Sequence, residues 1–149
     1  MALSDLEIST DPARIDIDLV HSFLATSYWA EGRSREVVER SIAHSICFGA
    51  YTAGRQVAFG RVVTDRAVFG YFADIFVVPE YRRRGISKRL VQAMLDHPDV
   101  ARLNGIQLRT RDAHGLYAQF GFAPVANAHE LMARYRGPDK SRQVSQSSL

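Results

Sequence analysis

Residues 77–90 read VVPEYRRRGISKRL, and this stretch gives the strongest local signal in the chain. It begins at the end of an apolar run, which Pro79 stops because proline lacks the amide that a sheet ladder requires. From Gly85 onward, apolar residues recur at helical spacing with charged residues between them. The stretch therefore predicts a strand, a loop with three successive arginines, and a helix over about residues 85–96.

The loop between that strand and that helix suits an anion. Backbone amides in such a loop can converge on one ligand, and the helix N-terminus adds roughly half a positive charge. Gly85 allows close approach of the backbone, Ser87 is small and offers a hydroxyl, and the arginines attract anions over a longer range. The glycines of the phosphate loop GxxxxGK(S/T) and of the dinucleotide fingerprint GxGxxG are missing. On these residues alone, a solvated basic surface with a turn glycine remains an alternative.

Upstream, the chain predicts two helices followed by an antiparallel meander. Asp16 can cap a first helix over residues 17–25, and Ser34 can begin a second helix that runs to about residue 45. The connections after these helices are short, and short connections join antiparallel strands. The strand-like runs of the meander are residues 46–51, 56–63 and 68–78.

Downstream of residue 96, strand and helix patterns alternate. We expect a strand over residues 102–111, then a short helix that Asp112 caps and Gly121 closes. A final strand-like stretch lies within residues 122–135. The expected fold class is therefore mixed α/β (α+β), with a mostly antiparallel sheet.

Length and composition place the chain among ordinary globular proteins. Its 149 residues, with 46% hydrophobic and 23% charged residues, exclude the disordered and fibrous classes. We expect one domain over residues 1–136 and a polar tail over residues 137–149. No apolar run suits a signal peptide or a membrane span, and the single Cys47 cannot form an intramolecular disulfide, so a cytoplasmic location is expected.

The net charge of +3 is concentrated in parts of the chain. Much of it lies at residues 82–89 and near the C-terminus, which favours a local anion site over a nucleic-acid surface. A nucleic-acid module would need a basic stripe with interleaved aromatic residues, and the sequence has none. No cluster of histidine and cysteine indicates a metal site.

Two stretches resemble one known family. Residues 75–90 resemble motif A of the GNAT N-acetyltransferases, whose core reads Q/R-x-x-G-x-G/A. Arg82 and Gly85 fit that core, and Ser87 stands where glycine or alanine is usual. Residues 113–122, AHGLYAQFGF, resemble the family's downstream signature A-x-x-x-Y-x-x-x-G-F.

This resemblance covers roughly residues 4–135. It implies a GNAT-like fold, with a mixed, mostly antiparallel central sheet flanked by helices on both faces. It also implies acetyl-CoA as the cofactor, no metal, and often a homodimer. In the family, the strand before motif A binds the pantetheine arm through its backbone and the loop binds the pyrophosphate. The implied cofactor-binding residues are Phe76, Val77, Val78, Arg82, Arg83, Arg84, Gly85, Ile86 and Ser87.

Acetyl transfer to an amine also needs a base and an acid. Only about one part in a thousand of an alkyl amine with a pKa of about 10.4 is neutral near pH 7.4. Asp74 is the candidate base, because it lies inside an apolar run where burial is expected to raise its pKa, and some family members carry their base on this strand. A water relay is the alternative base, and Asp74 could instead face solvent or cap a loop. Tyr117 matches the family's tyrosine beside the cofactor sulfur, which implies that it protonates the departing thiolate; a tyrosine of the core is the alternative.

The irregular segment before the second helix is the candidate acceptor site. Tyr28 and Trp29 offer flat faces to an amine-bearing or aromatic substrate, and Arg33 could hold a carboxylate. Trp29 could equally be an apolar plug between the first two helices. The resemblance implies transfer of an acetyl group to a primary amine of a small molecule or peptide. A catalytically silent module that senses acyl-CoA is the main alternative, and a basic nucleic-acid-binding domain is the third.

Overall fold

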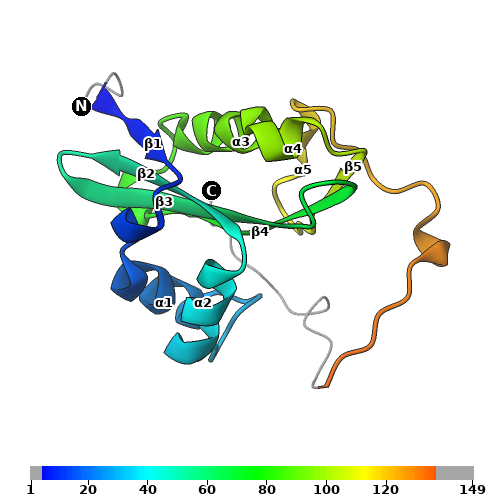
Figure 1. Cartoon of the computed structure of the whole chain (residues 1–149), viewed down its shortest axis with the longest axis horizontal. Coiled ribbons are helices and arrows are strands. Elements are labelled where there is room, and N and C mark those ends of the chain that lie inside the picture. The colour runs from blue at the N-terminus through cyan, green and yellow to red at the C-terminus, as the bar shows by residue number, and fades with distance from the viewer. Residues whose placement is uncertain (1–4, 137–149) are drawn as a thin grey trace.

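A five-stranded sheet organises the chain, with the strand order β1-β2-β3-β4-β5 (Figure 1). The computed structural model describes residues 5–136, so the tail predicted at residues 137–149 lies outside the described residues. Strands β1 to β4 are antiparallel to their neighbours, and β5 is parallel to β4. The strands are β1 Glu7–Ser9, β2 Ile46–Thr52, β3 Arg55–Thr64, β4 Phe69–Val77 and β5 Gly105–Gln107. The mixed, mostly antiparallel sheet and its meander are therefore confirmed.

Helices cover both faces of this sheet. Figure 1 shows α1 (Ile17–Thr26) and α2 (Arg35–Ala43) on one side and α3 (Ile86–Asp96) on the other. Asp16 caps α1 and Ser34 caps α2, as predicted. Each accepts a hydrogen bond through its side-chain oxygen from an amide of the first turn, at 3.0 and 3.2 Å, and so satisfies a donor that has no partner within its helix.

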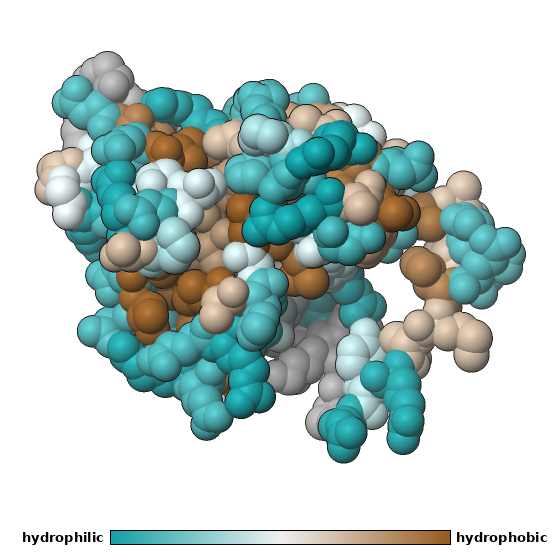
Figure 2. All heavy atoms as spheres, in the orientation of Figure 1, coloured by the Kyte–Doolittle hydropathy of each residue, from teal (hydrophilic) through white to brown (hydrophobic). Residues whose placement is uncertain are grey.

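The core lies between the helices and the sheet. Leu24 of α1 and Leu90 and Met94 of α3 are fully buried there. Gly60 of β3 permits this close packing, since a Cβ at that position would lie 2.9 Å from the Met94 sulfur. Figure 2 shows hydrophilic residues over the outer surfaces of the helices and hydrophobic residues between the helices and the sheet. Within the described residues, no helix has both the length and the hydropathy to span a membrane.

The second half of the chain departs from the predicted pattern. The strand expected over residues 102–111 shrinks to the 3 residues of β5, whose pairing with β4 ends at Tyr71. β4 contains a bulge at Asp74, and a bulge bends and twists its strand, so the two strands stop pairing before it. A short helix that was not predicted, α4 (Pro98–Ala101), precedes β5.

Helix α5 (His114–Ala118) begins without the predicted cap. Asp112 makes no capping bond; instead the Thr110 hydroxyl accepts a hydrogen bond from the Ala113 amide at 3.0 Å. Gly121 follows the helix with a φ of +86°, a conformation that glycine adopts without steric cost. The predicted end of this helix is therefore confirmed, and the predicted cap is wrong.

The final strand expected within residues 122–135 is also wrong. A strand needs a neighbour to satisfy its backbone, and this segment joins no sheet within the described chain. Its regular structure is one short 3-10 helix, η4 (Ala128–Glu130), and Figure 1 shows the segment running away from the body of the domain. Phe122 packs against the core, but the large apolar residues after it are exposed, up to 97% for Met132.

Candidate active site

In the described part of the chain, the loop between β4 and α3 leaves a row of backbone amides without acceptors. After β4 the chain makes one 3-10 turn, η3 (Pro79–Tyr81), and then leads into α3. Arg83 and Gly85 have φ values of +64° and +80°, whereas Arg84 between them does not have a positive φ. Such alternation of left-handed and other residues is typical of backbone that binds an anion through its amides. Within residues 5–136, the amides of residues 83–88 donate to no acceptor.

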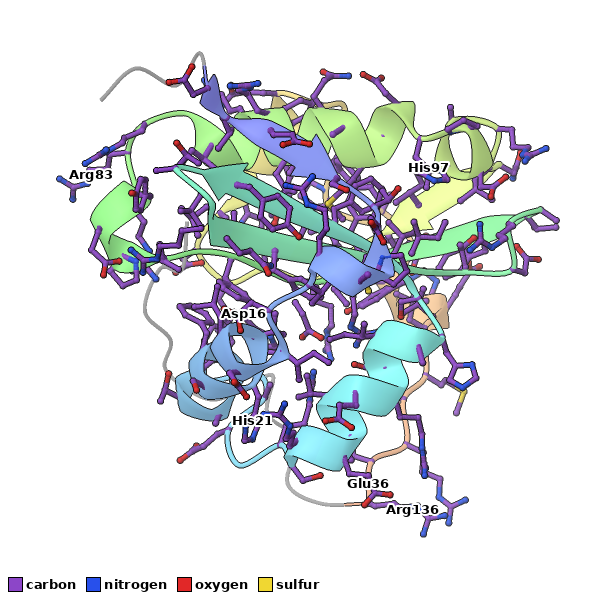
Figure 3. All side chains as sticks on the ribbon, turned by 60° about the vertical axis from the view of Figure 1, so that its left-hand side comes forward. Asp16, His21, Glu36, Arg83, His97 and Arg136 are labelled. Carbon is purple, nitrogen blue, oxygen red and sulfur yellow. The ribbon has the colours of Figure 1, made fainter. Side chains whose placement is uncertain are left out.

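The same loop lines a pocket of about 190 Å³. Unsatisfied amides at a helix N-terminus, with basic side chains around them, are the chemistry that a pyrophosphate requires. Arg83 and Lys88 are exposed, and Figure 3 shows Arg83 pointing away from the body, which suits long-range attraction of an anion. The lining residues are Val77, Tyr81, Arg82, Arg83, Gly85, Ile86, Ser87 and Lys88.

The three arginines of the loop differ in what they contact. Arg82 donates from Nε to the Val77 carbonyl at 3.0 Å, and its guanidinium lies 5.9 Å from the centre of the Phe23 ring. Arg84 lies 5.1 Å from the centre of the Tyr81 ring. Arg82 thus ties the loop to β4 and α1, a structural role that the sequence did not indicate.

The end of β4 offers backbone on its open edge. The side chains of Phe76, Val77 and Val78 are buried, and the Val78 amide donates to the Val57 carbonyl of β3 at 2.9 Å. Because pairing with β5 ends at Tyr71, the opposite edge of β4 has no strand partner beyond that point in the described chain. An extended ligand arm can therefore lie along this edge, where the Val77 carbonyl already accepts a hydrogen bond from Arg82.

Replacement of Gly85 with alanine is expected to weaken CoA binding about tenfold or more. Alanine at a φ of +80° costs about 1–2 kcal/mol, and it would add a methyl group to a residue that lines the pocket to which the resemblance assigns the pyrophosphate. Gly54 is the matched control, because it has a φ of +73°, has no atom within 4 Å of the place that a Cβ would take, and does not line the pocket. Titration calorimetry with CoA checks this. Equal CoA affinity in the two variants would contradict it.

Asp74 is held by three side chains from two other parts of the chain. The pairs Phe59–Phe76 and Arg61–Ala73 leave two β4 residues opposite one β3 residue, and Asp74 adopts a φ of +56° in this bulge. The Trp29 indole donates to its Oδ1 at 2.9 Å. Its Oδ2 accepts from Arg33 at 2.8 Å and from Arg61 at 2.6 Å.

The predicted rise in the pKa of Asp74 is wrong. Burial alone raises the pKa of this carboxyl group. The positive charges of Arg61 and Arg33, together with hydrogen bonds from Arg61 and Trp29, outweigh burial and hold the pKa below its ordinary value of 3.8. Asp74 is therefore an ion-paired carboxylate at neutral pH, with both oxygens engaged, which makes it a weak base. The alternatives of a solvent-facing or loop-capping carboxylate are also excluded, since its side chain is 3% exposed.

Tyr117 presents a buried hydroxyl that has no partner among the described residues. The residue is 6% exposed, and its ring packs against Phe122 with centroids 5.9 Å apart. Burial, with smaller contributions from Asp112 and Tyr28, raises its pKa far above the ordinary value, so the hydroxyl stays protonated. No hydrogen bond to it forms within residues 5–136, although leaving a buried hydroxyl unpaired costs about 1–3 kcal/mol. Such a group is available to a ligand.

Tyr28 and Trp29 join the acceptor segment to this region. Their ring centroids are 5.1 Å apart with edge-to-face geometry, and the Arg111 guanidinium lies 4.9 Å from the centre of the Tyr28 ring. Trp29 is half-buried near Phe23 and fixed by its bond to Asp74, so it is more than an apolar plug. The structure thus groups the predicted residues of segment 28–33 with Asp74.

Arg61 and Arg111 were missed at the sequence level. Arg61 stands inside the apolar run of β3, and a charge in such a run is the same signal that singled out Asp74. Arg111 has no comparable local signal, because its contact with Tyr28 depends on chain packing.

Comparison with known proteins identifies the family. Residues 43–124, more than half of the chain, match the family model "Acetyltransferase (GNAT) domain". The chain is 47% identical to a proposed GNAT acetyltransferase from Xanthomonas campestris pv. campestris, whose crystal structure it matches with a TM-score of 0.85 over 87% of this chain and 92% of that one. The chain belongs to the GNAT family of acetyltransferases and is an acyltransferase by class.

The chain also resembles more distant proteins, one in sequence and one in structure. A proposed acetyltransferase of Gibberella zeae is 26% identical over 110 residues, which is 60% of this chain and 62% of that protein, so the chain spans less than two thirds of this curated relative. An acetyltransferase structure from Clostridium acetobutylicum, described with acetyl-CoA, has a TM-score of 0.61 at 14% identity, covering 86% of this chain and 98% of that one. That second likeness shows the shared fold.

Proposed function

We propose that this protein transfers an acetyl group from acetyl-CoA to a primary amine of a small molecule or peptide, by direct attack within a ternary complex. The row of open amides around the pocket at the start of α3 carries the proposal, because it suits the pyrophosphate of CoA. The distant structural relative described with acetyl-CoA supports the same cofactor.

Three parts of the chain would hold the cofactor. The amides of residues 83–88 bind its pyrophosphate, with Gly85 and Ser87 allowing close approach. Arg83 and Lys88 attract it from solvent. The open edge of β4 at residues 76–78 binds its pantetheine arm through the backbone. When bound, acetyl-CoA supplies the acetyl group as a reactive thioester.

Proton transfers complete the reaction. As the new carbon–nitrogen bond forms and the carbon–sulfur bond breaks, Tyr117 donates its proton to the departing sulfur and then regains a proton from water. Its raised pKa ensures that the hydroxyl is protonated before the transfer. The amine loses its proton through water, because Asp74 is ion-paired and weakly basic. Asp74 acts as a positioning residue that fixes Trp29 and Arg33 beside the acceptor.

Release of CoA thiol tests this function. Saturating acetyl-CoA with a broad panel of amines and peptides is expected to release thiol above background, with one acetylated amine per thiol detected by mass spectrometry. CoA should also raise the melting temperature. A protein that CoA stabilises but that releases no thiol with any acceptor would overturn the proposal and favour a silent acyl-CoA sensor.

A further inference from the structure

The cluster around Asp74 carries one positive charge more than its carboxylate can balance. Arg33 and Arg61 both donate to the same oxygen, Oδ2. Within the described chain, neither guanidinium contacts any other carboxylate. Two guanidinium groups and one carboxylate leave a net charge of +1.

This excess charge is largely withdrawn from water. The exposed fractions of the side chains are 23% for Arg33, 14% for Arg61 and 3% for Asp74. An unbalanced charge in such a setting is costly, and an anionic ligand relieves the cost. The protein therefore gains more from an anion here than it would at an exposed arginine.

Donors of the right geometry remain open at this place. Arg33 uses only Nη1, so its Nε and Nη2 have no acceptor within residues 5–136. Arg61 uses Nε for Asp74 and Nη1 for the Ser45 hydroxyl at 3.1 Å, which leaves Nη2. Planar guanidinium groups with two free donors bind carboxylates and phosphates in a bidentate manner.

The cluster adjoins the aromatic residues of the proposed acceptor site. Trp29 is bonded to Asp74 and packs edge-to-face with Tyr28, over which Arg111 lies. An acceptor that lies against Tyr28 and Trp29 can thus extend toward Arg33 with its other end.

We propose that the acceptor is an amine that also carries an anionic oxygen group, a carboxylate or a phosphate, and that the open N–H groups of Arg33 and Arg61 bind this group. The inference rests on the proposed acetyl transfer and names its substrate class. Arg33 is the more exposed of the two and is the specificity-determining residue.

Matched acceptors test the charge requirement. One series is β-alanine, O-phosphoethanolamine and ethanolamine, and a second is L-phenylalanine and phenethylamine, with rates referred to the concentration of neutral amine. We expect an anionic member to exceed its neutral partner in kcat/KM by about tenfold or more, as charge-assisted hydrogen bonds predict. The ratio of kcat/KM for β-alanine to kcat/KM for O-phosphoethanolamine shows whether the site prefers a carboxylate or a phosphate.

The variant Arg33→Gln locates the site. It leaves Asp74 paired with Arg61 and is expected to lower kcat/KM about tenfold more for the anionic acceptor than for the neutral acceptor. Arg40→Gln on α2 is the matched control, because Arg40 forms an exposed ion pair with Glu36, and it should change neither value. Equal losses for anionic and neutral acceptors would assign Arg33 a structural role and overturn the inference.

A binding measurement separates this inference from the proposed function. The CoA-loaded protein is titrated with N-acetyl-β-alanine, N-acetyl-O-phosphoethanolamine and N-acetylethanolamine in a calorimeter. Preferential binding of an anionic compound, lost in Arg33→Gln, supports the inference even if no thiol is released. Turnover with a preference for neutral acceptors would overturn this inference but not the proposed function. If turnover and anion-dependent binding are both absent, both proposals are overturned.

Discussion

Replacement of Asp74 with asparagine is expected to lower the free energy of unfolding by about 3–5 kcal/mol, the cost of removing one partner from a buried ion pair. Asparagine keeps the shape of the side chain and tolerates the φ of +56°, so the change isolates the charge. Without the carboxylate, Arg33 and Arg61 face each other as unbalanced cations. Urea unfolding at neutral pH, followed by circular dichroism, measures the loss.

Asp18→Asn is the control for this variant. Asp18 pairs with Arg35, but its side chain is 80% exposed, so the loss should stay below about 1 kcal/mol. A loss below about 1 kcal/mol in Asp74→Asn as well would show that the ion pairs of Asp74 add no net stability. Since Asp74 also positions Trp29 and Arg33, the folded fraction of the variant is expected to release thiol more slowly than wild type.

The difference in unfolding free energy between wild type and Asp74→Asn should depend on pH, because the pKa of Asp74 is lowered in the folded state. A carboxyl group whose pKa is lower in the folded state than the ordinary 3.8 stabilises the fold above that value, and this contribution is lost as the pH falls through the folded-state pKa. The stability gap between wild type and Asp74→Asn should therefore be constant from about pH 5 to 8 and shrink in stronger acid. A gap that widens in acid would contradict the direction of the shift.

Replacement of Tyr117 with phenylalanine is expected to lower kcat about 100-fold or more, the usual range for loss of a positioned acid. The buried phenol hydroxyl has no protein partner within residues 5–136, so its removal should leave the melting temperature unchanged or slightly higher. The affinity for CoA should stay near that of wild type, since the amides of residues 83–88 are intact. Stopped-flow thiol release and CoA titration separate these effects.

Tyr135→Phe is the matched control for the Tyr117→Phe variant. Tyr135 is 48% exposed and bonded to Arg109, so loss of its hydroxyl should leave kcat within about twofold of wild type. Unchanged kcat in Tyr117→Phe would remove Tyr117 from the acid's role. A parallel loss of CoA affinity would instead indicate a tyrosine that only shapes the pocket.

Much of the fold could be predicted because its signals are local. The caps at Asp16 and Ser34, the meander turns and the helix after Gly85 each depend on residues a few positions apart. The parts that failed depend on distant partners. The strand over residues 102–111 was cut to β5 because its neighbour bulges at Asp74, and residues 122–135 found no strand to pair with in the described chain.

The sequence by itself determined the class of this protein and the strand-loop-helix unit to which the family resemblance assigns the cofactor. Proline, glycine, small residues and arginines in residues 77–90 define a strand-loop-helix unit whose open amides need no distant contact to form. Only the tertiary structure decided what Asp74 does. The pKa of a buried carboxyl group depends on the charges within a few ångströms of it. For Asp74 these charges belong to Arg33, which precedes α2, and to Arg61 on β3. For that reason a residue expected to be a raised-pKa base is an ion-paired carboxylate that holds Trp29 and Arg33 in place.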